Sequence, residues 1–157
     1  MLANVYKSEK GYVARYEQDL EHSAHHAWTW LTDNGKLSQW FAELSSDDLR
    51  SGGRMRFDMG DGTFENMTIT DFSEGSVLEY EWGEDSVRFE IEPRPNGCRL
   101  VLIETIRRIT EHTPKDLAGW HVCLDVVQAL MDGRPIPARE DEWKTRYEQY
   151  VQAIQAL

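Results

Sequence analysis

The sequence predicts an α+β protein in which a curved antiparallel sheet packs around one long, buried helix. Residues 117–131 place apolar side chains at helical spacing, and further apolar residues make that face wider than the stripe of a surface helix. The segments before this helix alternate between apolar and polar residues with the two-residue period of strands. A helix this apolar must be buried on most sides, so the sheet is expected to grip it.

Length and charge limit the class of protein. With 157 residues, the chain is predicted to be a single domain, 1–157, with a core of ordinary size. The formal net charge of -11 argues against a nucleic-acid partner, because phosphate binding needs clustered lysine and arginine. The N-terminal residues lack the apolar run of a secretory signal, and no segment approaches the ~20 apolar residues of a membrane span. We therefore expect a cytoplasmic protein without a membrane span.

The first part of the chain is predicted to form a strand and two short helices. The strand covers residues 12–20, and the helices cover residues 24–31 and 36–41. Ser23 is a suitable N-cap for the first helix, because its hydroxyl can accept a hydrogen bond from an unpaired N–H of the first turn. Residues 45–51 are expected to form a polar loop.

Five further strands are expected to follow as a meander. Turns containing glycine, aspartate or proline separate them, since glycine and aspartate tolerate the backbone angles of tight turns. The predicted strands are residues 54–59, 63–72, 77–82, 87–91 and 98–109. Together with the first strand they give a sheet of about six strands.

Two helices complete the predicted fold. Pro114 marks the start of the buried helix, and Gly133 marks its end. Residues 140–157 are expected to form an additional amphipathic helix with acidic residues in its first turn. The aromatic stripe of this last helix is expected to pack against the body of the domain rather than to bind a partner.

Large side chains on the predicted inner faces are candidates for the wall of a ligand pocket. The alternative is a filled core made from the same residues, because protein interiors normally pack without voids. The candidate ligand-binding residues are Trp40, Phe57, Met59, Tyr80, Trp82, Phe89, Trp120, His121 and Leu124.

His121 is the only candidate for a catalytic residue. It lies one helical turn from Asp125, so the two side chains could hydrogen-bond and hold the imidazole for proton transfer. The alternative is a histidine whose hydrogen bonds are purely structural. The two cysteines, Cys98 and Cys123, and the other histidines lack the spacing of metal ligands, so neither a metal nor another cofactor is predicted.

Several motifs, taken in order, resemble those of one known family. They are Ala27-Trp28-Thr29-Trp30-Leu31-Thr32-Asp33, Leu37-Ser38-Gln39-Trp40-Phe41, Gly52-Gly53-Arg54-Met55-Arg56-Phe57, Tyr80-Glu81-Trp82-Gly83 and Gly119-Trp120-His121-Val122-Cys123-Leu124. The ordered set resembles the heat-shock protein 90 ATPase activator homologue-like branch of the START-like (Bet v 1-like, polyketide cyclase/dehydrase) superfamily. His25-His26 and Asn34-Gly35 depart from the usual family pattern, and both pairs lie in a segment expected to be exposed.

The resemblance implies the helix-grip fold, with a cavity between the sheet and the long helix. In this superfamily such cavities take lipids, sterols, polyketides or other largely apolar molecules. The favoured function is therefore binding of a small apolar or amphipathic ligand without a cofactor.

Two alternative functions stay open at this point. One is an interaction protein that contacts a chaperone through its acidic surface and its C-terminal helix. The other is a cofactor-independent cyclase or hydrolase with His121 as acid/base and Tyr80 as hydrogen-bond donor. A homodimer contact through the C-terminal helix or a strand edge is the remaining partner to consider, although no motif indicates it.

Overall fold

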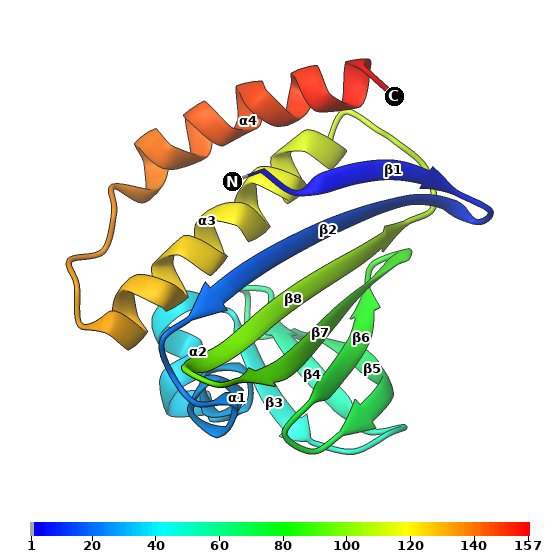
Figure 1. The fold of residues 1–157 in the computed structure, drawn as a ribbon. Coiled ribbons are helices and arrows are strands. Elements are labelled where there is room, and N and C mark those ends of the chain that lie inside the picture. The colour runs from blue at the N-terminus through cyan, green and yellow to red at the C-terminus, as the bar shows by residue number, and fades with distance from the viewer. Residues whose placement is uncertain (1) are drawn as a thin grey trace. The chain divides into compact units, whose positions relative to one another are not determined.

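The computed structural model describes residues 2–157 and contains eight strands and four helices in that range (Figure 1). The strands are β1 (Asn4–Ser8), β2 (Gly11–Leu20), β3 (Leu44–Asp48), β4 (Arg54–Asp58), β5 (Phe64–Ser73), β6 (Val77–Trp82), β7 (Asp85–Arg94) and β8 (Gly97–Ile106). The helices are α1 (Ala24–Thr32), α2 (Asn34–Trp40), α3 (Thr113–Asp132) and α4 (Arg139–Gln155).

The strands form one open sheet in the order β1-β2-β8-β7-β6-β5-β4-β3. The run from β3 to β7 is a meander in which each strand pairs antiparallel with the next. This confirms the predicted α+β class and the antiparallel sheet. The expected number of strands is wrong, because the sheet has eight strands rather than about six.

The two strands that the sequence did not predict are the edges of the sheet. β1 has the sequence NVYKS and is exposed along most of its length, while β3 has the sequence LSSDD and, apart from Leu44, lies in the predicted loop at residues 45–51. Neither segment alternates between apolar and polar residues, so the period-two signal is missing. β1 and β3 are strands because they pair with β2 and β4, which their own sequences do not indicate.

The chain forms two compact units. Unit 1 consists of Met1–Tyr16 and Ile103–Leu157, and unit 2 consists of Glu17–Leu102. Strands β2 and β8 each pass from one unit to the other. The single domain expected over residues 1–157 stays a prediction.

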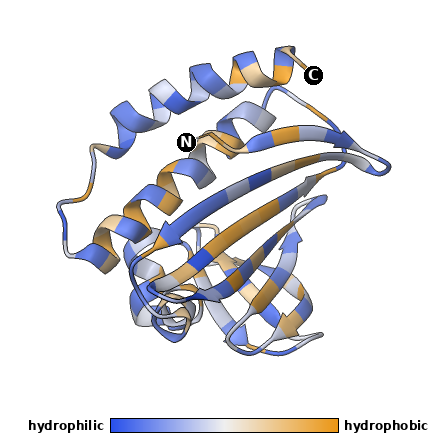
Figure 2. Cartoon of the chain, in the orientation of Figure 1, coloured by the Kyte–Doolittle hydropathy of each residue, from blue (hydrophilic) through white to orange (hydrophobic). Residues whose placement is uncertain are grey.

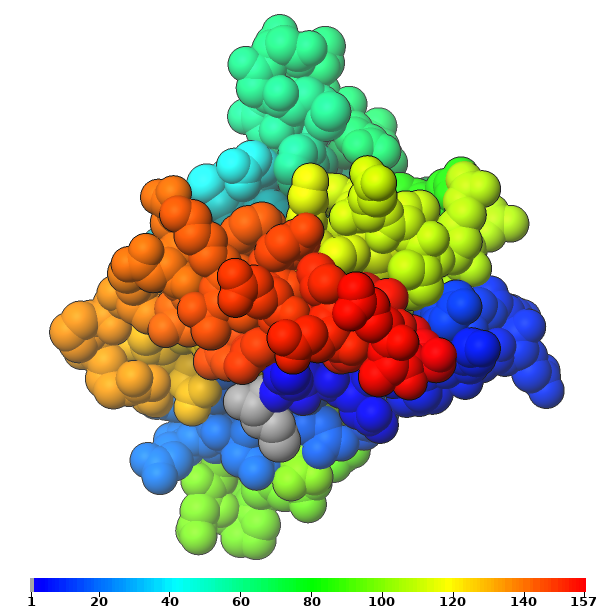
Figure 3. All heavy atoms as spheres, turned by 90° about the horizontal axis from the view of Figure 1, so that it is seen from above, coloured from blue at the N-terminus to red at the C-terminus, as the bar shows by residue number. Residues whose placement is uncertain are grey.

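In unit 1, α3 and α4 lie side by side (Figures 1 and 3). Figure 2 shows many hydrophobic residues on α3 and a mostly hydrophilic α4. Two aromatic side chains of α4 are tied to the rest of unit 1: the Trp143 indole donates a hydrogen bond to the Lys115 carbonyl (3.3 Å), and Tyr150 is fully buried. The aromatic stripe of α4 is therefore buried at Tyr150, while Trp143 and Tyr147 stay partly exposed.

Two glycines, one inside α3 and one directly after it, differ in whether a side chain could replace them. Gly133 follows the helix with φ of +68°, a left-handed conformation that costs a side-chain-bearing residue about 1 kcal/mol. Gly119 lies inside the helix, and a Cβ added there would meet nothing within 4 Å.

We therefore expect Gly133→Ala to lower the free energy of unfolding by about 1 kcal/mol and Gly119→Ala to raise it by about 0.5–1 kcal/mol. Urea denaturation of both variants measures the two changes. Equal effects of the same sign would contradict this account of the helix end.

In unit 2, side-chain caps and one indole fix the two short helices. The Ser23 hydroxyl accepts a hydrogen bond from the His26 N–H (3.1 Å), which confirms the predicted N-cap of α1. The Asp33 carboxylate accepts one from the Gly35 N–H (3.0 Å) at the start of α2. The Trp40 indole donates to the Trp30 carbonyl (2.8 Å) and so joins the two helices.

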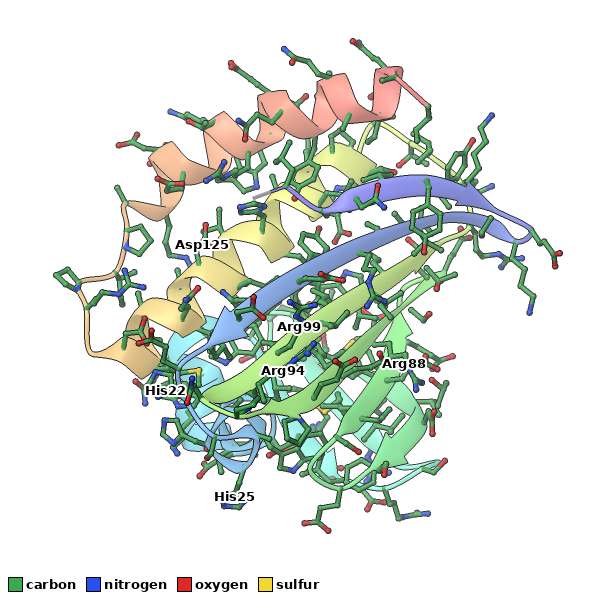
Figure 4. All side chains as sticks on the ribbon, viewed as in Figure 1. His22, His25, Arg88, Arg94, Arg99 and Asp125 are labelled. Carbon is green, nitrogen blue, oxygen red and sulfur yellow. The ribbon has the colours of Figure 1, made fainter. Side chains whose placement is uncertain are left out.

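Carboxylates of the unit 2 strands are partly neutralised by arginines (Figure 4). Arg88 contacts Asp71 (2.8 Å), Glu79 (3.3 Å) and Glu90 (2.6 Å). The hydrogen bond from Arg88 lowers the pKa of Asp71. These partly exposed groups form the solvated acidic surface that the alternation of the strands predicts.

Candidate functional site

The residues predicted to line a pocket divide between the two units. Trp120, His121 and Leu124 belong to α3 in unit 1, and all three are buried. The other predicted residues lie in unit 2: Trp40, Phe57, Met59, Tyr80, Trp82 and Phe89. Each unit contains one group of side chains that could carry a function.

The group in unit 2 consists of Phe41, Phe57 and Trp82, which we call the aromatic cluster. Each ring contacts the other two edge to face, with centroid separations of 6.1 Å for Phe41 and Phe57, 5.8 Å for Phe41 and Trp82, and 6.0 Å for Phe57 and Trp82. All three side chains are partly exposed. The edge-to-face geometry is the one that the quadrupoles of aromatic rings favour.

Three different elements position these rings. Phe41 caps the C-terminus of α2 and donates its backbone N–H to the Leu37 carbonyl (2.9 Å). Phe57 lies in β4, and Trp82 is the last residue of β6. The cluster therefore forms where the end of α2 meets the ends of two strands.

Buried aromatic rings continue the cluster into the core of unit 2. Trp40 is buried and contacts Phe41 edge to face at 6.1 Å. Tyr80 shares a strand face with Trp82, and its buried ring stacks on Phe89 at 6.3 Å. Of the predicted unit 2 residues, Phe57 and Trp82 belong to the aromatic cluster, Trp40 contacts it through Phe41, and Tyr80 and Phe89 contact each other. Phe41 was not predicted, although it directly follows Trp40 in the family-like motif.

Met59 does not lie on the inner face where the alternation placed it. Strand β4 ends at Asp58, and Met59 follows in the hairpin loop with 53 % of its side chain exposed. Asp58 accepts a hydrogen bond from the Gly60 N–H (2.9 Å), which turns the chain away from the strand direction. The period-two pattern cannot indicate where a strand ends, so it extended the face by one residue too many.

The group in unit 1 is a buried hydrogen-bond network around His121. The Tyr150 hydroxyl lies 2.8 Å from His121 Nδ1 and accepts a hydrogen bond from the Ala3 N–H (2.9 Å). The Tyr16 hydroxyl donates to the Leu117 carbonyl (2.9 Å), and its ring lies edge to face with the imidazole. The network joins residues of β2, α3 and α4 with Ala3, which directly precedes β1.

Burial keeps His121 neutral at neutral pH. Desolvation by burial lowers the pKa of His121 to about 4 and raises that of Tyr150 to about 12. We assign Tyr150 as the donor, so that its hydroxyl donates a hydrogen bond to Nδ1 of His121. The neutral imidazole then carries its own proton on Nε2. Asp125 Oδ2 is 3.6 Å from Nε2, which is too long for the predicted hydrogen bond (Figure 4 labels Asp125 on α3).

Glu104 is a buried charged residue that sequence reasoning missed. Its side chain is fully buried near the end of β8, and its proximity contributes to raising the pKa of Tyr16, for which desolvation is the largest cause. A glutamate within the apolar run of residues 100–106 was the available signal. Buried carboxylates are rare unless they are paired, so such a position marks a specific polar environment.

The described residues provide neither a metal site nor a helical membrane span. Residues 2–157 contain no group of three or more His, Cys, Asp and Glu side chains arranged to hold a metal ion. No helix in that range is both long and apolar enough to cross a membrane.

An open antiparallel sheet with two short helices after its second strand and a long helix near the C-terminus is the architecture of START-like α+β proteins. The chain belongs to the family described as Activator of Hsp90 ATPase homolog 1-like protein, whose family model matches residues 21–132, more than half of the chain. A comparison with curated proteins finds no match.

Solved structures share the fold. A conserved protein of unknown function from Enterococcus faecalis has a TM-score of 0.87 and 25% identity, covering 99% of this chain and 91% of that one. CalU16 from Micromonospora echinospora has a TM-score of 0.71 and 18% identity over 97% and 95% of the two chains. The Aha1 dimer from Colwellia psychrerythraea has a TM-score of 0.63 and 14% identity over 74% and 93%.

Proposed function

We propose that the chain binds a small apolar or amphipathic molecule and that the aromatic cluster contacts the apolar part of this ligand. The observation that carries the proposal is the partial exposure of three mutually packed rings: Phe41, Phe57 and Trp82. Single exposed apolar side chains are common, whereas contiguous apolar patches mark binding surfaces. The family membership supports the same conclusion, because START-like proteins are expected to take largely apolar ligands.

The cluster is suited to this task on physical grounds. Aromatic rings offer large contact areas while losing few rotatable bonds on binding. The rings beneath them are held by packing and by the hydrogen bond from Trp40 to Trp30, so the surface is formed before a ligand arrives. Pre-organisation of this kind reduces the entropy cost of binding.

The two alternative functions have less support. The aromatic stripe of α4, on which a chaperone contact was expected, is partly used within unit 1: Tyr150 is buried and the Trp143 indole bonds the Lys115 carbonyl. For an acid/base role, His121 is 96 % buried by accessible surface, with Nδ1 already bonded to Tyr150.

Binding can be tested with N-phenyl-1-naphthylamine, a neutral probe whose fluorescence rises in apolar surroundings. We expect saturable binding to the wild-type protein and an affinity about five to ten times weaker for Trp82→Leu and Phe41→Leu, since each loses an aromatic contact of about 1 kcal/mol. The control is Tyr6→Leu, which removes a 42% exposed ring from β1 in unit 1.

The outcomes of this titration are distinct. Equal affinities for the wild type and both cluster variants would place the probe elsewhere, and no saturable binding to the wild type would refute the proposed function. Native mass spectrometry of protein purified from its own host then identifies the ligand. Stabilisation against heat should grow with the concentration of that ligand, as linkage requires.

A further inference from the structure

The indole N–H of Trp30, in α1, is a buried hydrogen-bond donor that finds no acceptor among residues 2–157. Only 8 % of this residue is exposed, and its backbone carbonyl already accepts the hydrogen bond from the Trp40 indole. Native proteins pair nearly all of their buried donors, because a buried hydrogen bond that is not made is costly. The N–H of Trp30 is therefore available to an acceptor that a bound molecule supplies.

The Lys36 side chain of α2 brings a positive charge to the same ring. Its Nζ lies over the Trp30 ring, 5.7 Å from the ring centre, and donates a hydrogen bond to the Thr29 hydroxyl (2.8 Å). Within the part of the chain that the structure describes, the ammonium contacts no carboxylate. Because an ammonium has three protons to donate, it can serve a bound acceptor as well as Thr29.

This lack of a carboxylate is unusual for a basic group of unit 2. Aspartates and glutamates outnumber lysines and arginines by more than two to one in residues 17–102, where Lys36 is the only lysine. Most arginines of this unit contact a carboxylate: Arg50, Arg54, Arg88, Arg94 and Arg99. Lys36 instead keeps its charge beside the N–H donor of Trp30, and the two together suit a negatively charged acceptor.

Basic groups also surround His26, which lies one helical turn before Trp30 in α1. The pKa of His26 is lowered first by desolvation and then by the charges of Lys36, His22 and His25, which are all basic. Figure 4 labels His22 and His25 at the start of α1. The surroundings of Trp30 and Lys36 are therefore basic, although unit 2 as a whole is acidic.

We propose that Trp30 and Lys36 form a binding subsite for the carboxylate of a small organic acid. The indole N–H and the ammonium each donate a hydrogen bond to this carboxylate. An indole nitrogen lies within about 2.5 Å of its ring centre, so the two donors are at most about 8 Å apart, which one carboxylate can bridge. This inference goes beyond the proposed function and does not depend on the aromatic cluster.

Entry of the acid requires a movement of Lys36. Its side chain is partly exposed and has a flexible four-carbon stem, and the ammonium gives up only the hydrogen bond to Thr29 when it shifts. A hydrogen bond between two charged groups is stronger than one to a neutral hydroxyl. A carboxylate therefore replaces the bond to Thr29 with a better one, whereas a neutral acceptor gains less.

Benzoate and benzamide test the subsite, because they have nearly the same shape and differ in charge. Nitrogen–proton correlation NMR resolves the indole N–H signals, and Trp30→Phe identifies the signal of Trp30 by its loss. If that variant does not fold, sequential assignment of the wild type identifies the signal instead. Benzoate at low salt should move the Trp30 signal downfield in a saturable way, with an affinity about ten times higher than that of benzamide.

Variants of Lys36 separate charge from shape. Lys36→Met keeps most of the stem and should weaken benzoate binding about tenfold, whereas Lys36→Arg should keep most of the affinity. The matched control is Arg56→Met. Arg56 also places a cation over an aromatic ring, 4.0 Å from the centre of Phe64, but that ring has no N–H donor. This control should bind benzoate as the wild type does.

The possible results are decisive for the subsite and leave the proposed function to its own titration. Saturable movement of the Trp30 signal that Lys36→Met weakens and Arg56→Met does not would establish the subsite. Benzoate binding without movement of the Trp30 signal would overturn it, as would equal affinities for benzoate and benzamide. Unchanged affinity in Lys36→Met, or no binding of benzoate to the wild type, would overturn it as well.

Discussion

Tyr150→Phe is expected to lower the free energy of unfolding by about 2–3 kcal/mol. The substitution keeps the ring in place but removes a hydroxyl that bonds the Ala3 N–H and Nδ1 of His121. Both groups would be left without that partner in a buried environment, and each unsatisfied polar group costs about 1–3 kcal/mol. Urea denaturation monitored by tryptophan fluorescence measures the loss.

Tyr147→Phe is the matched control for this measurement. Tyr147 lies on the same helix, one turn before Tyr150, and its partly exposed ring stacks on Trp143 at 5.3 Å. Removal of its hydroxyl should change the free energy of unfolding by less than about 0.5 kcal/mol. A loss for Tyr150→Phe no larger than the loss for this control would show that the buried network contributes little.

The stability that depends on His121 is expected to fall as the pH decreases from about 6.5 to about 4. The pKa of His121 is lowered to about 4 in the folded protein from an ordinary value of 6.5. Between these values the unfolded chain binds a proton that the folded chain does not, so protonation favours unfolding. The shift corresponds to roughly 3 kcal/mol that is fully present above pH 6.5 and lost below pH 4.

His121→Gln isolates this contribution. The free-energy difference between the wild type and this variant should be largest at pH 7.5 and should narrow by roughly 3 kcal/mol toward pH 4. Asp125, whose pKa is raised by desolvation, titrates in both proteins and so largely cancels. Gly119→Ala adds no titratable group, and its difference from the wild type should stay constant; a constant difference for His121→Gln as well would contradict the lowered pKa.

Local patterns made most of the fold predictable. The 3.6-residue period found both long helices, and Pro114 and Gly133 placed the ends of α3 within one residue. The predicted helix 140–157 differs from α4 by one residue at its start and two at its end, and the glycine turns found the meander from β4 to β8. The edge strands β1 and β3 were not predicted, because they are held in the sheet by pairing with a neighbouring strand and not by an apolar pattern of their own. Long helices and hairpins are local structures, whereas edge pairing is decided by the rest of the sheet.

The sites were less predictable, for related reasons. Periodicity indicated that Phe57, Tyr80 and Trp82 share inner faces, and the structure brings Phe57 and Trp82 together with Phe41. It correctly marked His121 as buried but assigned it Asp125, the nearest carboxylate on the same helix. The observed partner is Tyr150, 29 residues away, because contacts between helices depend on their packing and not on spacing within one of them.

The bond from the Ala3 N–H to the Tyr150 hydroxyl joins residues 147 positions apart. On the ribosome, the β1–β2 hairpin emerges before α4, so the bond that fixes the start of β1 has to wait until α4 has been translated. Until α4 emerges, Ala3 and His121 both lack the hydroxyl that they share in the finished protein. Premature termination before residue 150 therefore leaves two defects, one in the first strand and one in the long helix.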